Sequence, residues 1–408
     1  MKRVGECGKN TLVGDKVNDP KAKEIPAVLV VNSGYSQQRN MIYAKSFGVD
    51  CSVTRDRLSI LHKVWHRLSG EGYSSFLHCW ALVTCPKDKL VHSFNGIVFG
   101  CLYWVVTFET NLPRLGSIPS FLIRITWRKL ADSNCVAILA LSDSARQILK
   151  QDLFENRPKM PEVLCSAIRK KLFVLHPPQP LSVHAIEEKQ GQMDWNGPLR
   201  LALIGHDFYR KGGLEVLTAV EGLLEVGKDI HLSIAGKMAA HDYASRAGEP
   251  EIRKAEAIME KFPDQIQRLG SVPGEAVKDL LVRSHILCLP TWGDTYGYSV
   301  LEGQAAGCAA ITTNIRALPE INNNDCGWVI SVPKLYNGDG DLDTSEKREH
   351  FRDVLVNGLI RFIKEAHDDR VQLERKAKAS LERIRREHDP EKHADRLKAI
   401  YSRKNANG

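Results

Sequence analysis

Short apolar stretches alternate along the chain with longer amphipathic ones. In the first half, the apolar stretches predict strands at Ala27–Asn32, Lys89–Phe94, Leu102–Phe108, Val136–Leu141 and Leu172–Leu175. Helical periodicity between them predicts helices at Gln37–Phe47, Ser117–Leu130 and Ser142–Leu153. Near-continuous apolar strands that alternate with helices are typical of parallel sheets covered on both faces.

The second half repeats this pattern. Its predicted strands are Leu199–Ile204, Ile230–Ala235, Ile266–Leu269, His285–Leu289 and Ala309–Thr312. Its predicted helices are Gly213–Val226, Glu251–Lys261, Gly274–Val282 and Ser299–Ala306. The sequence therefore predicts an α/β protein with two doubly wound parallel sheets.

A polar, proline-rich stretch from Pro177 to Pro198 joins the two halves and lacks periodicity, as a linker does. A chain of 408 residues also exceeds what one ordinary core accommodates. We expect two domains, residues 1–180 and 181–408, with the second ending in the charged helices that follow Asp343.

Composition narrows the class of protein. The formal charge of +8 is a mild excess that is compatible with anionic substrates or an anionic membrane surface and too diffuse to argue for nucleic acid, which we do not expect as a partner. The ten cysteines are scattered without a CxxC pair, which favours a reduced cytoplasmic protein over a disulfide framework or zinc site. The apolar run Gly96–Phe108 is too short to span a bilayer, which takes about 20 residues.

The segment Pro290–Gly307 carries the clearest chemistry. A strand runs into a loop of small residues, the loop opens a short helix, and the carboxylates of Asp294 and Glu302 flank the loop. Free N–H groups and the positive dipole end of a helix suit phosphate, whereas carboxylates accept hydrogen bonds from sugar hydroxyls. The pattern indicates a sugar attached to a phosphate. Ser299 and Glu302 also form a capping-box pattern, so this segment alone leaves both interpretations open.

Two further strand-end loops have glycines and polar residues. In Ile204–Gly213 the loop carries Arg210 and Lys211, a pair that suits a diphosphate or forms ordinary surface charge. After the first strand, Gly34 either lets the backbone approach a phosphate closely or only makes a turn.

In order along the chain, these motifs resemble the signature of the retaining glycosyltransferases of family 4. The segments that carry the resemblance are Gly205–Gly213, Leu232–Lys237, Leu269–Pro273 and Leu289–Gly307, with looser matches at Val91–Asn95, Trp104–Glu109, Leu141–Arg146 and Lys171–Pro177. The resemblance covers roughly residues 27–332 and is strongest from 199 to 330. It implies the GT-B fold, in which two Rossmann-like domains face each other across a cleft, with the donor in the second domain and the acceptor presented by the first.

The resemblance also implies roles for individual residues. Glu302 binds the ribose hydroxyls of the donor, Asp294 stands where the family has a glutamate that contacts the transferred sugar, and Lys211 binds phosphate. The other implied donor contacts are Gly34, His206, Arg210, Val272, Thr295, Tyr296, Gly297 and Tyr298.

Two positions depart from the family pattern. His206 replaces the usual arginine, for which Arg210 is the expected substitute. Glu109 replaces a histidine near the reacting sugar; its carboxylate either accepts a sugar hydroxyl and stabilises positive charge at the anomeric carbon, or is a solvated strand end. The expected catalytic residues are therefore Asp294, Glu109 and Lys211.

We expect neither a cofactor nor a metal ion. No GxGxxG follows a strand and no GxxxxGK[ST] is present. The acidic run Asp339–Asp343 lacks the glycine and the glutamate of a calcium loop.

The expected function is transfer of a sugar, with retention, from a nucleotide-diphosphate sugar to a glycan, lipid-linked or other hydroxyl acceptor in envelope polysaccharide or glycoconjugate synthesis. Aromatic and basic residues of the first half predict peripheral docking at the inner face of the membrane, unless the aromatics are core residues. They are Trp65, Arg67, Tyr73, Trp80, Arg114, Arg124, Trp127, Arg128 and Lys129. The alternative functions are a nucleotide-sugar 2-epimerase and a non-enzymatic relative that binds a nucleotide sugar.

Overall fold

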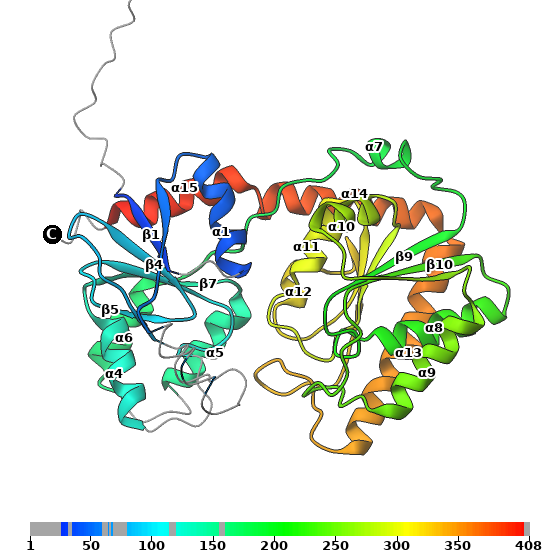
Figure 1. The fold of residues 1–408 in the computed structure, drawn as a ribbon, viewed down its shortest axis with the longest axis horizontal. Helices are drawn as coiled ribbons and strands as arrows, with labels where there is room; N and C mark the ends of the chain where they lie inside the picture. The colour runs from blue at the N-terminus through cyan, green and yellow to red at the C-terminus, as the bar shows by residue number, and fades with distance from the viewer. Residues whose placement is uncertain are drawn as a thin grey trace, which may run out of the picture.

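Two parallel six-stranded sheets lie side by side in a computed structural model that describes residues 26–31, 35–58, 64, 67, 80–113, 120–154 and 160–403 (Figure 1). Each sheet is covered by helices on both faces, as the alternation of apolar strands and amphipathic helices predicts. We call the first sheet with the helices packed on it the N-terminal body, and the second sheet with its helices the C-terminal body.

The first sheet has the strand order β2-β1-β4-β6-β7-β8, and every pair is parallel. Its strands are β1 Val28–Val31, β2 Cys51–Thr54, β4 Leu90–Phe94, β6 Trp104–Phe108, β7 Cys135–Ala140 and β8 Leu172–Val174. Its helices are α1 Tyr35–Ser46, α4 Ser120–Ala131, α5 Asp143–Phe154 and α6 Glu162–Lys171. Strands β3 Trp80–Leu82 and β5 Ile97–Phe99 form a separate parallel pair.

The second sheet has the order β11-β10-β9-β12-β13-β14, again parallel. Its strands are β9 Leu199–Ile204, β10 Ile230–Ala235, β11 Ile266–Gly270, β12 Ile286–Leu289, β13 Ala309–Thr313 and β14 Gly327–Ile330. The helices that follow or precede them are α7 Ile186–Gln190, α8 Gly213–Glu225, α9 Glu249–Lys261, α10 Gly274–Val282, α11 Tyr298–Ala305, α12 Leu318–Ile321, α13 Ser345–Asp368 and α14 Arg370–Glu387.

The predicted strands and helices are present, with ends shifted by a few residues. Central strands such as β6, β7 and β13 are buried along their whole length, which explains their continuous apolar sequence. The sequence pattern did not reveal β2, β3, β5 and β14, which are short. Exposed positions interrupt the apolar pattern of β2.

The last helix, α15 (Pro390–Tyr401), requires a correction to the expected division at residue 180. It packs against α1 and β7, so it belongs to the N-terminal body although it follows the whole C-terminal body in sequence (Figure 1). Leu397, Ile400 and Tyr401 join the buried cluster of the first sheet. The Tyr401 hydroxyl lies 2.7 Å from Nδ1 of His92, which is buried on β4. The chain therefore crosses the boundary between the bodies twice.

Within the described residues, no helix is long and apolar enough to cross a membrane.

Candidate functional site

A pocket of about 480 Å³ opens at the carboxyl ends of β9, β10, β11 and β12. Ligands of open α/β sheets bind at this edge, because the loops that leave the strands meet there. The lining residues come from the loops that follow these four strands and from the first turns of α10 and α11. They are Ile204, Gly205, His206, Asp207, Arg210, Lys211, Ala235, Gly236, Ser271, Val272, Val277, Asp294, Tyr298, Ser299 and Glu302.

Backbone contact between two loops shapes the pocket beside Lys211. Gly212 has a φ of 81°, and a Cβ atom there would lie 2.2 Å from the carbonyl oxygen of Pro290. Only glycine tolerates both this φ and this approach. The contact brings the Lys211 loop against the segment that carries Asp294.

Lys211 and Asp294 form an ion pair inside the pocket, with side chains that are 14% and 11% exposed. Burial by itself would raise the pKa of the Asp294 carboxyl, but Lys211, followed by Arg210, holds that pKa below its usual range. Asp294 is therefore ionised at neutral pH, and it neutralises the lysine that faces the pocket.

Arg210 has a different set of partners. Its guanidinium donates to the carboxylate of Asp207 and to the carbonyl oxygen of Gly293. Arg210 thus ties the β9 loop to the β12 loop while it lines the pocket. Asp207 was not singled out from the sequence, because its role depends on a loop geometry that the residue pattern does not define.

Helix α11 begins with its amino end at the pocket. Its N-cap is Gly297, with a φ of 93° and no side-chain cap. Ser299 already lies inside the helix, so it does not cap it, and the capping box considered for Ser299 and Glu302 is wrong. Tyr298, Ser299 and Glu302 instead line the pocket. First-turn N–H groups without helical partners offer hydrogen bonds to an anion.

A second pocket of about 490 Å³ adjoins the first and shares Ile204, His206, Val277 and Glu302 with it. It continues past Glu302 to α10 and to the linker, where it is lined by Tyr43, Gln179, Pro180, Leu181, Ser182, Gly274, Glu275, Lys278 and Leu281. Glu302 and His206 stand where the two pockets meet. Tyr43 comes from α1 of the N-terminal body, a contribution that no local sequence signal announces.

The loop after Asp294 touches the N-terminal body. Thr295 Oγ1 donates to Glu109 Oε2 at 3.4 Å, and the Tyr296 hydroxyl lies 3.1 Å from Nδ1 of His176. The backbone N–H of Glu109 donates to Asn95 Oδ1 at 3.1 Å, which fixes the end of β6. The structure therefore brings Glu109 to the loop that follows Asp294, from a position far away in sequence.

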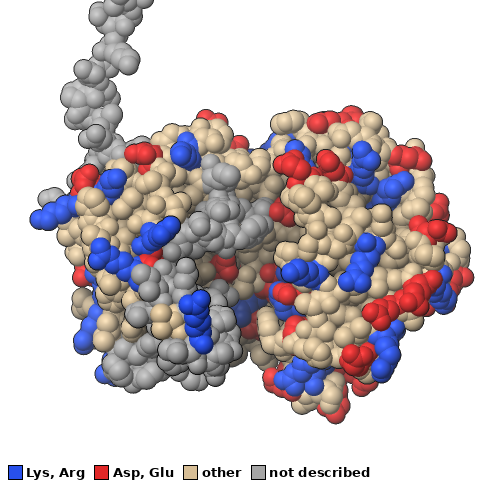
Figure 2. Space-filling view, viewed as in Figure 1, with Lys and Arg blue, Asp and Glu red and all other residues tan. Residues whose placement is uncertain are grey.

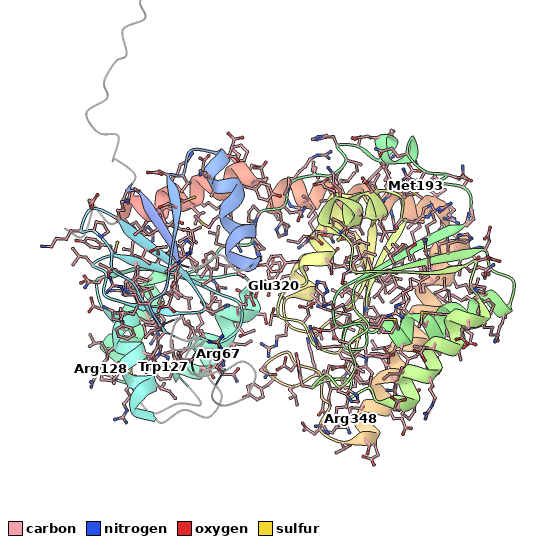
Figure 3. The ribbon with its side chains drawn as sticks, in the orientation of Figure 1. Arg67, Trp127, Arg128, Met193, Glu320 and Arg348 are labelled. Carbon is pink, nitrogen blue, oxygen red and sulfur yellow. The ribbon has the colours of Figure 1, made fainter. Side chains whose placement is uncertain are left out.

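The remaining sequence predictions have mixed outcomes. Gly34, Trp65, Tyr73 and Arg114 lie outside the described residues. Trp127 is a core residue: its side chain is 1% exposed and its indole N–H donates to the Leu112 carbonyl. Trp80 is half-buried and packs edge-on against Phe99. Arg67, Arg124 and Arg128 are exposed, and Figure 3 shows Arg128 on the outer side of the N-terminal body.

No group of three or more His, Cys, Asp or Glu side chains is placed to hold a metal ion in the described part of the chain.

Comparison with known proteins places a family domain on this site. Residues 186–335, which contain α11 and the loops that line the first pocket, match the family described as Glycosyl transferases group 1. Among curated relatives, the gpi3 subunit of the Schizosaccharomyces pombe phosphatidylinositol N-acetylglucosaminyltransferase is 25% identical over 125 residues, which is 30% of this chain and 25% of that protein. Glycogen synthase of Mycobacterium tuberculosis is 24% identical over 206 residues, 50% of this chain and 42% of that protein. These matches span less than half the length of either relative.

Solved structures resemble the whole chain. A glycosyltransferase from Rickettsia africae superposes with a TM-score of 0.60 at 13% identity and covers 94% of this chain and 99% of its own. Anabaena Alr3699/HepE in complex with UDP gives 0.58 at 8% identity, over 92% and 99% of the two chains. Sucrose-phosphate synthase from Thermosynechococcus elongatus gives 0.57 at 12% identity, over 94% and 100%. Together with the two parallel-sheet bodies, these likenesses confirm the expected GT-B fold.

Proposed function

We propose that this protein is a retaining glycosyltransferase that uses a nucleotide-diphosphate sugar and needs no metal ion or cofactor. The observation that carries the proposal is the convergence, in one strand-end pocket, of Lys211, the amino end of α11 and the carboxylates of Asp294 and Glu302. Cationic and N–H donors suit a diphosphate, and carboxylates on either side suit hydroxyl groups. The match of residues 186–335 to Glycosyl transferases group 1 supports the same assignment.

In this proposal the diphosphate lies at Lys211 and the first turn of α11. Glu302 accepts the ribose hydroxyls where the two pockets meet, with His206 and Val272 beside it and the nucleobase toward the adjoining pocket. The transferred sugar lies toward Asp294 and Thr295. Donor phosphate competes with Asp294 for Lys211, so the ion pair of the free protein holds the lysine in place until the donor arrives.

Glu109 is the contribution of the N-terminal body to the reacting centre, held near Thr295. The acceptor hydroxyl attacks the anomeric carbon on the face from which the diphosphate departs. The C–O bond to the diphosphate breaks, the new glycosidic bond forms, and a diphosphate oxygen takes the acceptor proton. Such a reaction depends on positioning and charge stabilisation more than on a strong protein base. Contact between the bodies at Thr295 and Tyr296 also shields the donor from water.

The acceptor is a glycan or a lipid-linked hydroxyl, and we propose a cytoplasmic protein that docks peripherally on an anionic membrane face. The relatives support both acceptor types, since one is a glycogen synthase and one a phosphatidylinositol N-acetylglucosaminyltransferase subunit. In the chain itself, α4 presents the exposed side chains of Arg124, Ile125 and Arg128. Figure 2 shows Lys and Arg spread over the visible face of the N-terminal body. An apolar residue between cations suits a headgroup surface.

A thermal-shift panel of UDP, GDP and ADP sugars tests the donor. A ligand at 100 times its Kd stabilises the native state by about 2.7 kcal/mol, so at least one of these sugars raises the Tm of the wild type. The Lys211→Ala variant should lose most of that shift. Incubation with the stabilising donor alone then separates a transferase, which leaves the sugar stereochemistry of the remaining donor unchanged, from an epimerase, which releases the free epimer. A flat response to all three nucleotide classes contradicts the proposal.

A further inference from the structure

One carboxylate crosses the boundary between the two bodies. Glu320, on α12 of the C-terminal body, accepts the backbone N–H of Asp143 at 2.6 Å and of Ser144 at 2.6 Å. Both N–H groups belong to the first turn of α5 in the N-terminal body. Figure 3 shows Glu320 in the region between the bodies. Charge-assisted bonds of this kind, at the positive end of a helix, are among the strongest hydrogen bonds between a side chain and the backbone.

The first turn of α5 is fully occupied by this arrangement. Ser142 Oγ accepts the N–H of Ala145 at 3.0 Å, so the cap of the helix's own body and the carboxylate from the other body divide the amides between them. Arg146 pairs with Asp143, which limits the repulsion between the carboxylates of Asp143 and Glu320.

Helix α12 is packed against the start of α11. A Cβ atom at Gly297, the N-cap of α11, would lie 2.6 Å from a methyl group of Leu318 and 3.2 Å from one of Ile321. Gln304 of α11 also donates to the carbonyl oxygen of Ile321 at 2.8 Å. Glu320 therefore stands on an element that touches the loop Asp294–Tyr298 directly, and movement of α12 is transmitted to this loop.

Three hydrogen bonds between this loop and the N-terminal body are longer. Thr295 reaches Glu109 at 3.4 Å, Tyr296 reaches His176 at 3.1 Å, and Asn40 reaches Tyr298 at 3.4 Å. Two bonds of 2.6 Å from a charged acceptor are firmer than these contacts. The position of Glu109 relative to Asp294 thus depends on the contact that Glu320 makes.

Burial of the Glu320 carboxylate opposes this contact. Burial raises the pKa of the Glu320 carboxyl, and the two backbone N–H groups offset only part of that rise. Keeping the ionised carboxylate at the boundary therefore costs desolvation free energy. If the bodies separate, water can hydrogen-bond both the carboxylate and the two N–H groups of α5. A joint that must release product needs such a reversible contact.

We propose that Glu320 is a positioning residue for the reaction: it holds α5 against α12 so that Glu109 meets the sugar of a donor bound in the C-terminal body. This inference rests on the proposed glycosyltransferase function. It predicts that loss of the contact lowers turnover and separates the bodies. Nucleotide binding is largely retained, because the C-terminal body and the linker supply most of the lining of both pockets.

The test compares variants on both sides of the boundary. Glu320→Ala removes the acceptor. Asp143→Pro removes one of the donated N–H groups at the first position of α5, where proline is tolerated, and Asp143→Ala is its matched control because it keeps that N–H. Glu349→Gln, an exposed change on α13, controls for lost charge.

The measurements are kcat with the donor that stabilises the wild type, the Kd of UDP, GDP and ADP, the radius of gyration in solution, and the Tm. We expect Glu320→Ala and Asp143→Pro to lower kcat about tenfold or more, consistent with the loss of a charge-assisted bond. Both should increase the radius of gyration while the nucleotide Kd changes less than about threefold. Asp143→Ala and Glu349→Gln should behave as wild type.

Each outcome decides one of the two proposals. Unchanged kcat and unchanged radius of gyration in Glu320→Ala overturn the role of Glu320 and leave the transferase assignment intact. Nucleotide binding lost in parallel with kcat also overturns it, because Glu320 then acts within the donor site. A wild type that turns over no donor overturns the proposed function, and the radius of gyration of the variants still shows whether Glu320 holds the bodies together.

Discussion

Glu302 stands on the wall between the two pockets of the C-terminal body, on a helix whose N-cap is glycine. Since Ser299 does not cap α11, the helix has no need of Glu302 as a capping partner. In the proposed function, this carboxylate lies between the diphosphate and the nucleobase and accepts two vicinal ribose hydroxyls.

The first prediction concerns this carboxylate. Glu302→Gln should weaken binding of the stabilising nucleoside diphosphate by about tenfold or more, since a hydrogen bond to a charged group contributes about 1.5–3 kcal/mol. The Tm should change little, because Gln keeps the size of Glu and most of its hydrogen-bonding capacity. Calorimetric titration measures the affinity, with Glu349→Gln as the control. Equal affinity in variant and wild type would show that Glu302 does not contact the nucleotide.

The second prediction concerns the ion pair of Lys211 and Asp294. Lys211→Ala leaves a buried carboxylate without its main partner, so it should destabilise the protein by about 3 kcal/mol, and Lys211→Ala/Asp294→Asn should recover much of that loss. The pair lowers the pKa of Asp294 in the folded protein. Its contribution to the free energy of unfolding is therefore complete above the pKa of the unfolded chain, about 3.9, and is lost as pH falls through the lower pKa of the folded protein. Urea unfolding at neutral pH measures both variants. A double variant as unstable as the sum of its single changes contradicts this coupling.

At the scale of elements, the loop between β9 and α8 combines two cations with different tasks. Arg210 is bonded to Asp207 and to the Gly293 carbonyl, whereas Lys211 faces the pocket beside Asp294. The loop therefore presents one cation to a ligand and uses the other to hold its shape.

A third prediction follows from this loop. Replacing Arg210 and Lys211 together by Ala should weaken binding of nucleoside diphosphate far more than binding of the nucleoside, because the proposed diphosphate site loses the Lys211 ammonium and the loop loses the bonds of Arg210. Lys211→Ala alone should account for most of that loss. Titration of both variants with UDP and uridine, or with the base that the thermal-shift panel selects, gives the two ratios. Equal losses of affinity for the nucleotide and the nucleoside would show that Arg210 and Lys211 do not contact the diphosphate.

Helix α4 carries the fourth prediction. Arg124 and Arg128 are exposed around Ile125, and Trp127 faces the core, so cations rather than an aromatic belt would meet a membrane. The wild type should co-sediment with phosphatidylserine vesicles at low salt, release as salt rises, and ignore phosphatidylcholine vesicles. Arg124→Glu/Arg128→Glu should abolish binding, and the same charge change in Arg253→Glu/Lys254→Glu on α9 should not. Equal binding of both variants to the vesicles would show that α4 does not contact the membrane.

At the scale of the whole molecule, buried histidines make the fold sensitive to acid. Burial lowers the pKa of His92, His285 and His393 to about 3 each, and that of His388 to about 4. In the unfolded chain each has a pKa of about 6.5, so between these values the unfolded state binds more protons than the native state. Three of these residues, His92, His388 and His393, lie on or beside the chain that returns to the N-terminal body.

The fifth prediction is therefore a loss of stability as pH falls below about 6.5, with each additional proton contributing about 1.4 kcal/mol per pH unit. Urea unfolding at about pH 7, 6 and 5 measures it. His393→Leu should reduce the dependence of the unfolding free energy on pH by about 1.4 kcal/mol per pH unit, because it removes one group that takes up a proton on unfolding. The fold should tolerate this change, since among the described residues Nδ1 of His393 has no hydrogen-bond partner to lose. A slope that is the same in His393→Leu would exclude this residue as a cause.

The sequence by itself determined the two parallel sheets, most of their strands and helices, the strand-end loops that carry Lys211 and Asp294, and the helix that carries Glu302. These features depend on apolar periodicity and on short-range glycine and polar patterns, which are local properties of the chain. It also provided the resemblance that implies a GT-B fold.

Only the tertiary structure decided which distant residues meet. In the structure α15 packs on the N-terminal body, and Trp127 is buried in the core. Glu109 accepts a hydrogen bond from Thr295, and Glu320 accepts two from the backbone of α5. An apolar helix face or a carboxylate has the same local sequence whichever partner it packs against. The partner is chosen by the packing of both bodies at once, and this packing is not encoded in any single segment.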